Sequence, residues 1–173
     1  MSPRGLRFYT PADYVRRVLW ALVQPLWRWS PRLCWGWRRM VLRVFGAKVG
    51  QGVRVYPAAR IHQPWHLVIG PRCTIAWNCV LYCLAPVTIG ADAVLSQGSQ
   101  LCAGDHAIRD PEFPILKRPI VVGDGVWVAA EAFIGPGVSI GDRAVVGACA
   151  VVMRSVLAGT VVVGNPARVV GLR

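Results

Sequence analysis

Aliphatic residues return every six positions through most of this chain, and a small residue follows many of them. The clearest series runs in six-residue steps from Val122 to Val152. A period of six fits neither an amphipathic helix nor an alternating strand. It is typical of a parallel β-helix, in which each repeat is one short strand and a bend. Earlier positions in the same phase are Val49, Val55, Ile61, Ile69, Ile75, Leu81, Ile89, Leu95 and Leu101.

A second inward position falls four residues after many of the aliphatic ones. Residues there are mostly small, as the narrow interior of a three-walled solenoid requires. We therefore predict one hexapeptide per wall and three per coil, with residues eighteen apart stacked at the strand spacing of about 4.8 Å. Members of this second set are Cys73, Cys79, Ala93, Ser99, Val126, Ala132, Val138, Ala144 and Ala150.

The rhythm breaks three times. Steps of eight separate Ile61 from Ile69 and Leu81 from Ile89, and a longer gap follows Leu101. Prolines and acids in this gap predict an extended excursion loop at residues 103–119. We expect function there, because loops that leave a solenoid carry side chains that its walls cannot present.

Residues 1–48 form a different segment, predicted as an amphipathic helical arm rich in Trp and Arg. Its longest apolar run is too short to span a bilayer and is interrupted by Pro25. Trp and Arg together suit the membrane–water boundary, so we expect peripheral membrane contact through residues 11–45. Packing of the arm over one end of the solenoid is the open alternative. Without a recognition motif, we expect no nucleic-acid partner.

The positive charge is concentrated in the N-terminal part of the chain. Residues 1–60 contain twelve Lys and Arg against the single acid Asp13, which gives +11 of the chain's +12. Hydrophobic residues make up 54% of the chain and charged residues 16%, which supports a substantial core. We expect the solenoid at 49–157 and a separate C-terminal segment at 158–173. The expected location is cytoplasmic, with peripheral contact at the inner face of the membrane.

The cysteines and histidines do not indicate a metal site. No CxxC pair occurs among the six cysteines, and the three histidines are scattered. We interpret the cysteines as small core residues kept reduced, and His62 and His66 as structural. His106 stands apart because it lies where the largest break begins. Imidazole there could act as general base toward a hydroxyl, or could simply be a hydrogen-bonded loop residue.

Beyond these patterns, the chain resembles hexapeptide acyltransferases of the galactoside and maltose acetyltransferase type. The resemblance is carried by the repeats, the loop at His106, the Val126–Val128 segment and the closing residues 163–168. Residues 29–31 and 42–50 extend it to the colanic acid biosynthesis acetyltransferases. It implies a left-handed β-helix, a homotrimer with sites between subunits, and acetyl-CoA as donor. The implied activity is O-acetylation of a sugar hydroxyl in an exopolysaccharide or lipid-linked glycan intermediate.

The resemblance also implies roles for individual residues. His106 would be the catalytic base. The group that orients its ring stays open between Asp105, Asp110 and a backbone carbonyl, since the acid that the relatives place after the histidine is absent here. A backbone N–H of Ala129 or Ala130 would donate to the oxyanion. Acetyl-CoA would be bound by Trp127, Gly147, Ala148, Arg154 and Arg168, with residues 158–173 on the CoA side. The acceptor would be bound by Asn78, Cys83, Asp105 and Asp110.

Three other functions remain open from the sequence. One is a non-catalytic scaffold in a polysaccharide-biosynthesis complex, with the arm as its docking element. Another is an N-acetyltransferase acting on an amino sugar. The last, a hydratase of the γ-carbonic anhydrase kind, would need three histidines to converge, and His62, His66 and His106 have the wrong spacing for it.

Overall fold

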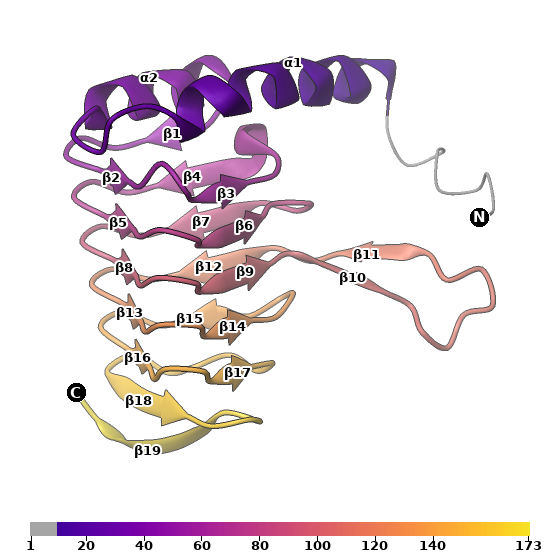
Figure 1. The fold of residues 1–173 in the computed structure, drawn as a ribbon. Helices are drawn as coiled ribbons and strands as arrows, with labels where there is room; N and C mark the ends of the chain where they lie inside the picture. The colour runs from indigo at the N-terminus through magenta and orange to yellow at the C-terminus, as the bar shows by residue number, and fades with distance from the viewer. Residues whose placement is uncertain (1–9) are drawn as a thin grey trace.

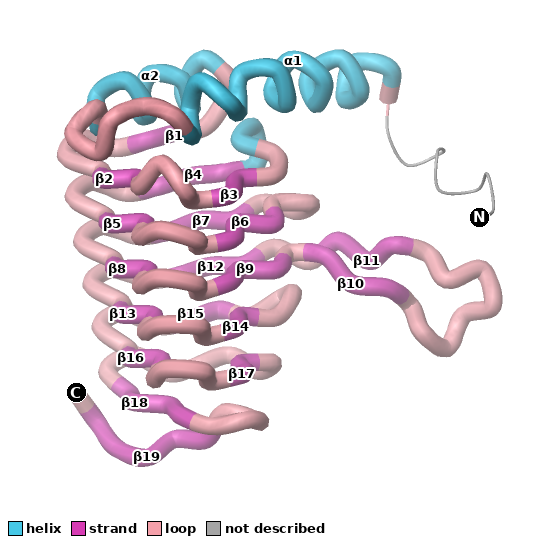
Figure 2. The backbone as a smooth tube through the Cα atoms, in the orientation of Figure 1, coloured by secondary structure: helices cyan, strands magenta, loops and turns pink. Residues whose placement is uncertain are grey.

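The computed structural model describes residues 10–173 and shows a three-walled parallel β-helix with two helices across one end (Figure 1). Figure 2 shows how short the strands are relative to the turns between them. The first wall contains β1 (Lys48–Val49), β4 (Leu67–Ile69), β7 (Val87–Ile89), β12 (Ile120–Val122) and β15 (Ser139–Ile140). The second contains β2 (Arg54–Val55), β5 (Thr74–Ile75), β8 (Val94–Leu95), β13 (Trp127–Val128), β16 (Val145–Val146) and β18 (Thr160–Val163). The third contains β3 (Arg60–Ile61), β6 (Val80–Tyr82), β9 (Gln100–Cys102), β14 (Phe133–Ile134) and β17 (Val151–Val152).

The predicted hexapeptide phase is confirmed. Every aliphatic position of the series from Val49 to Val152 is buried, and the small positions between them are 0–1% exposed. In Figure 1 the chain runs rightward along the near walls and leftward along the far wall as it descends, which is a left-handed winding. The solenoid therefore has the hand that the family resemblance implied.

All three breaks in the rhythm fall at one corner, between the third and first walls. A 3₁₀ helix at Pro64–His66 fills the first break, and a short turn fills the second. Because of these insertions, Val55 pairs with Ile75, twenty residues on, whereas the predicted spacing of eighteen holds for Val128 and Val146. The third break is an antiparallel hairpin of β10 (Gly104–His106) and β11 (Ile115–Lys117), which projects away from the solenoid (Figure 1).

The arm covers the N-terminal end of the solenoid with α1 (Pro11–Arg28) and α2 (Trp35–Val44). Trp20 is buried and donates from its indole Nε1 to the carbonyl of Ile61 at 2.7 Å. Arg38 is also fully buried, and its Nε donates to the carbonyl of Val55 at 2.5 Å. The capping alternative is thus correct for the inward face of the arm. Residues 1–9 of the predicted arm lie outside the described residues.

The C-terminal segment continues the solenoid. Val156 bridges to Ile140 of the first wall, and β18 extends the second wall. β19 (Arg168–Leu172) then folds back antiparallel on β18 and closes this end. The boundary predicted at residue 157 therefore falls within the stack of coils. None of the helices in residues 10–173 is long and apolar enough to cross a membrane.

Candidate active site

His106 lies at the end of β10, on the projecting hairpin of residues 103–119. Its backbone pairs with Ile115 on β11, so the two strands hold the histidine away from the solenoid walls. The side chain is half-buried and borders a shallow hollow of about 550 Å³ with Ile108, Asp110 and Leu116. The hairpin thus presents an accessible imidazole outside the core.

The His106 ring is oriented by Phe113. Its Nδ1 lies 3.1 Å from the carbonyl oxygen of Phe113, and the two rings stack with centroids 4.3 Å apart. A carbonyl only accepts hydrogen bonds, so Nδ1 carries the proton and the neutral ring keeps its lone pair on Nε2. That tautomer is the one that a general base requires. Phe113 itself has a φ of +47° and donates from its backbone N–H to the carbonyl of Asp110 at 2.8 Å.

Of the three orienting groups left open by the sequence, the structure selects the backbone carbonyl. The Asp105 carboxylate accepts from the backbone N–H of His106 at 2.7 Å, and the Asp110 carboxylate accepts from that of Glu112 at 2.9 Å. Both carboxylates therefore stabilise the hairpin backbone. Both residues are exposed, and their predicted contact with an acceptor stays a prediction.

A second group of predicted residues meets at the corner between the second and third walls. Trp127 is 45% exposed there, and its indole Nε1 donates to the hydroxyl of Ser96 at 2.9 Å. We call the hollow beside it, of about 380 Å³, the notch. Its walls are Ser96, Gln97, Trp127, Ala129, Ala130, Val145, Gly147 and Ala148.

The two candidate backbone donors for the oxyanion are not equivalent. The N–H of Ala129 donates to the carbonyl of Val146 at 2.8 Å, so it is already used by the second wall. Of the two predicted donors, Ala129 is thus excluded, because its N–H is used in the hydrogen bonds between neighbouring coils. The N–H of Ala130 has no acceptor within the described part of the chain. Ala130 is therefore the donor that the notch can offer.

Small residues keep the notch open. Gly147 is packed so closely that an added Cβ would lie 2.6 Å from Cγ1 of Val163 and 3.3 Å from the carbonyl of Val162. Ala148, next along the chain, is exposed at the notch. Gly147 must therefore stay small because of its packing against Val163, whereas a larger side chain at Ala148 would fill the notch itself.

Arg154 and Arg168 border another hollow, of about 610 Å³, at the C-terminal end of the solenoid. No acid lines it among the described residues, so its charge is positive. Arg168 donates to the adjacent carbonyl of Ala167 at 3.0 Å. Both guanidinium groups are exposed and suited to bind phosphate.

The two remaining predictions for the acceptor end differ in outcome. Asn78 is exposed at the same corner as the notch, with a φ of +58°. Cys83 is fully buried, and burial raises the pKa of its thiol to about 12. Cys83 cannot contact an acceptor, and its assignment is corrected to core packing. Cys73 and Cys79 are core residues too, as predicted, whereas Cys149 is exposed.

The other two histidines have structural contacts. Nδ1 of His66 lies 2.9 Å from the carbonyl of Cys83, which fixes the 3₁₀ helix against the next coil. The ring of His62 packs edge-on against Tyr82 at 5.0 Å. Within residues 10–173, no three His, Cys, Asp or Glu side chains gather as a metal site would require.

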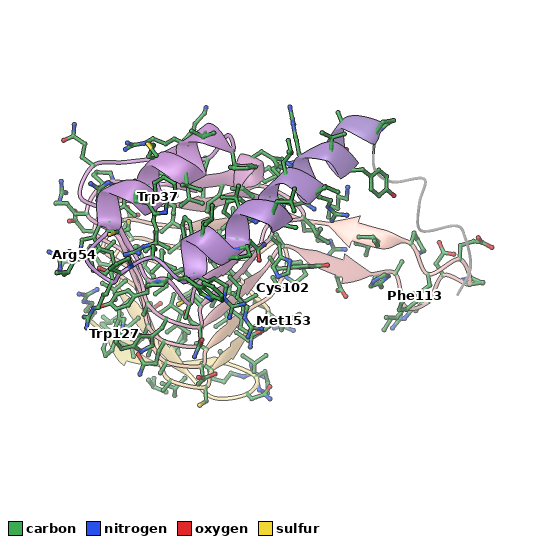
Figure 3. All side chains as sticks on the ribbon, turned by 45° about the horizontal axis from the view of Figure 1, so that its top comes forward. Trp37, Arg54, Cys102, Phe113, Trp127 and Met153 are labelled. Carbon is green, nitrogen blue, oxygen red and sulfur yellow. The ribbon has the colours of Figure 1, made fainter. Side chains whose placement is uncertain are left out.

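One chain does not bring the base and the notch together. Figure 3 shows Trp127 on one side of the molecule and Phe113, against which His106 stacks, at the far end of the hairpin on the other. The sequence indicated His106 and Trp127, but not Phe113 or Ser96. Phe113 acts through a main-chain carbonyl, which any residue carries, and the Ser96 hydroxyl becomes relevant only through the stacking of coils.

Comparisons with known proteins agree with this architecture. Residues 119–154 match the family model for the bacterial transferase hexapeptide (six repeats). The WcaF protein of Escherichia coli strain K12, named as a colanic acid biosynthesis acetyltransferase, is 42% identical over 169 residues, covering 97% of this chain and 91% of the relative. Nodulation protein L of Rhizobium meliloti strain 1021 is 39% identical over 136 residues, covering 76% of this chain and 74% of that protein.

Solved structures give the same result. The hexapeptide-repeat acetyltransferase VCA0836 of Vibrio cholerae, in complex with acetyl coenzyme A, superposes with a TM-score of 0.85 at 27% identity. The match covers 95% of this chain and 91% of that one. A maltose O-acetyltransferase of Clostridium difficile 630 superposes with a TM-score of 0.86 at 25% identity, covering 94% and 89%.

Proposed function

The chain belongs to the hexapeptide-repeat acetyltransferases, and on that basis we propose that it transfers an acetyl group from acetyl-CoA to a sugar hydroxyl. The acceptor is a unit of an exopolysaccharide or a lipid-linked glycan intermediate. The 42% identity to a colanic acid biosynthesis acetyltransferase over almost the whole chain supports this. The acetyl coenzyme A complex of VCA0836 supports the identity of the donor.

The reaction needs a base, and the tautomer of His106 supplies one. Nε2 of His106 takes the proton of the acceptor hydroxyl as that oxygen attacks the thioester carbonyl carbon. A C–O bond forms, the C–S bond breaks, and the same nitrogen returns the proton to the departing thiolate. The N–H of Ala130 donates to the oxyanion formed in between. Two substrates held side by side need no acyl-enzyme.

The observation that carries this proposal is the separation of His106 from the notch. A site made from both requires the hairpin of one copy to reach the notch of another. Around a threefold axis, each of three identical subunits can provide a hairpin on one side and a notch on the other. We therefore place the active sites between the subunits of a homotrimer.

The direct test is His106→Ala, with His62→Ala as the matched control. Loss of the base should lower kcat for acetyl transfer by about 10²- to 10⁴-fold, while acetyl-CoA binding and the trimer mass by light scattering stay unchanged. The control should keep its activity, because the ring of His62 packs against Tyr82 and His62 belongs neither to the hairpin nor to the notch. A fully active His106→Ala enzyme would refute the assigned base.

The outer surface of the arm supports peripheral membrane contact through residues 11–45. Exposed apolar side chains recur on α1 at helical spacing, facing away from the solenoid, and continue onto α2. With the +11 charge of residues 1–60, this surface fits an anionic bilayer at its interfacial depth. The end face, as we call it, consists of Val15, Val18, Leu19, Leu22, Leu26, Trp29, Leu33, Trp37, Met40 and Val44.

Co-sedimentation with phosphatidylglycerol vesicles tests the end face. Wild-type protein should bind these vesicles and bind pure phosphatidylcholine weakly. The pair Leu22→Glu and Leu26→Glu should abolish sedimentation, because both side chains would have to enter the bilayer. The matched pair Val169→Glu and Leu172→Glu, exposed on β19 at the opposite end, should bind like wild type. Equal binding by both pairs would exclude the end face as the docking surface.

A further inference from the structure

A hollow of about 660 Å³ lies under the C-terminal half of α1, outside the notch and the hairpin. Arg28, Trp29 and Arg32 line it from the arm, and Pro57 and Trp77 line it from the first two coils. We call it the Arg32 groove. Its surface combines two exposed indoles, of Trp29 and Trp77, with two guanidinium groups. This combination suits a sugar joined to an anion.

Arg32 is held in place before any ligand binds. Its Nη2 donates to the hydroxyl of Tyr56 at 2.7 Å, and its guanidinium lies over the rings of Tyr56 and Trp77 at 4.8 and 5.1 Å. These two rings pack edge to face at 4.6 Å. Stacking uses the faces of a guanidinium and leaves its in-plane N–H donors available. Nε and Nη1 of Arg32 have no acceptor within the described part of the chain.

No carboxylate compensates this charge. The sequence contains no acid between Asp13 and Asp92. Asp92 is already paired with Arg72 at 2.5 Å, and Asp13 accepts hydrogen bonds at the N-terminus of α1. The guanidinium of Arg28 has no hydrogen-bond or ion-pair partner among residues 10–173. Two uncompensated guanidinium groups on one hollow favour a ligand with more than one negative charge.

The Arg32 groove and the notch occupy one corner column. Ile75, Leu95 and Val128 stack in register, so Trp77, Gln97 and Ala130 hold equivalent positions in successive coils. Backbone bonds connect them: Gly98 donates to the carbonyl of Trp77 at 3.1 Å, and Glu131 donates to that of Gln97 at 3.0 Å. Two coils, or about 10 Å, therefore separate Trp77 from the proposed oxyanion donor.

The order along this column matches an acceptor with a remote anionic group. Arg168, one of the two cations expected to bind the CoA phosphates, pairs with Val163 at the C-terminal end of this column. Arg154 lies at the same end of the solenoid, at the corner between the third and first walls. Arg28 and Arg32 lie at the N-terminal end, beyond the notch. A donor and an acceptor that are both anionic could thus approach the notch from opposite ends without crowding their charges.

We propose that the Arg32 groove binds the diphosphate of a glycosyl diphosphate acceptor, whose sugar stacks on Trp77 and extends toward the notch. The inference rests on the proposed acetyl transfer and specifies its acceptor. The diphosphate can be linked to a polyprenyl lipid or to a nucleoside. The end face borders the groove through Trp29, which favours the lipid.

Binding of soluble diphosphates to the full-length protein tests the proposal without knowledge of the sugar. Inorganic pyrophosphate probes the anion alone, farnesyl diphosphate the lipid source and uridine diphosphate the nucleotide source. The variant pair Arg28→Gln and Arg32→Gln should weaken binding of all three at least about tenfold, because it removes the charge-assisted donors. The control pair Arg54→Gln and Arg60→Gln removes the same charge from exposed positions outside the groove and should bind like wild type.

The outcomes separate the sources. Tighter binding of farnesyl diphosphate identifies a lipid-linked acceptor, and tighter binding of uridine diphosphate identifies a nucleotide-linked one. Equal affinities in the wild type and the Arg28/Arg32 pair, or equal losses in both pairs, would overturn the diphosphate site. Unchanged acetyl-CoA affinity in the Arg28/Arg32 pair shows that the fold is intact. The His106→Ala variant should bind diphosphates normally, so failure of the assigned base would leave this inference standing.

Discussion

At the scale of single residues, the catalytic assignment depends on how one imidazole is held. Among residues 10–173, no carboxylate contacts the ring of His106, and the carbonyl and ring of Phe113 take that place. Because a carbonyl cannot give up a proton, it fixes the tautomer without joining the proton transfer. In the proposed mechanism, Phe113 is therefore a positioning residue that acts through His106.

Phe113→Ala keeps the carbonyl but removes the ring that stacks on the imidazole. We expect kcat to fall by about tenfold, since a base that samples other rotamers spends less time in the reactive one. KM for acetyl-CoA should not change, because in the proposed trimer the donor lies against the notch of another subunit. Steady-state kinetics would show this split, and Phe113→Tyr should restore kcat.

The control is Ile108→Ala on the same hairpin, where the side chain is 79% exposed and the substitution should have no effect. An equal loss of kcat in both variants would mean that the hairpin, and not the stacked pair, sets the rate.

At the scale of elements, the solenoid could be predicted because its signal is local and repeated. Each hexapeptide places one aliphatic residue inward, so the phase survives even where a break adds residues. The hairpin could be located but not described, because its pairing and the carbonyl of Phe113 have no side-chain signature. The choice of Ala130 as the oxyanion donor also depends on how the coils stack. Only the next coil, whose Val146 carbonyl accepts from the N–H of Ala129, shows that Ala129 is already hydrogen-bonded.

The composition of the arm left open whether it contacts a membrane or packs over the solenoid. Tryptophan suits both a lipid interface and a protein core, but the position of each tryptophan around the helix decides which of the two it contacts. Trp20 and Trp27 are seven residues apart, face the solenoid and are 3% and 1% exposed. Trp29 is 89% exposed on the other face. One helix thus caps the solenoid with one side and leaves an apolar side unpaired.

Stacking of coils also predicts which glycines resist substitution. Gly70 lies at the corner between the first and second walls, where an added Cβ would be 2.6 Å from the backbone of Gly90 and Ala91. Backbone cannot move aside like a side chain, so Gly70→Ala should lower the free energy of unfolding by about 1–3 kcal/mol. Urea denaturation of the purified protein would measure this change.

Gly171→Ala is the matched control, because no atom lies within 4 Å of its added Cβ. It should unfold at the same urea concentration as the wild type. If Gly70→Ala were equally stable, the coils would have to be less tightly stacked at this corner than the structure shows.

At the scale of the whole molecule, the chain is a column with distinct ends. The apolar end face and the Arg32 groove lie at the N-terminal end, and the cations of Arg154 and Arg168 lie at the other. Subunits related by a threefold axis parallel to the columns would present three end faces on one side. Membrane contact and acceptor entry would then occur at the same side of the trimer, with the donor entering from the opposite side.

Complementation between two inactive variants can distinguish a site shared between subunits from a site within one chain. His106→Ala removes the proposed base, and Ala148→Trp fills the notch, so each homotrimer should be inactive. In a mixed trimer, an intact hairpin of an Ala148→Trp chain can face the open notch of a His106→Ala chain. Random assembly of equal amounts makes roughly one interface in four of this kind, so co-expression should restore roughly a quarter of wild-type activity. Refolding the two variants separately and mixing them afterwards provides the control, and inactivity of the co-expressed mixture would place the whole site within one chain.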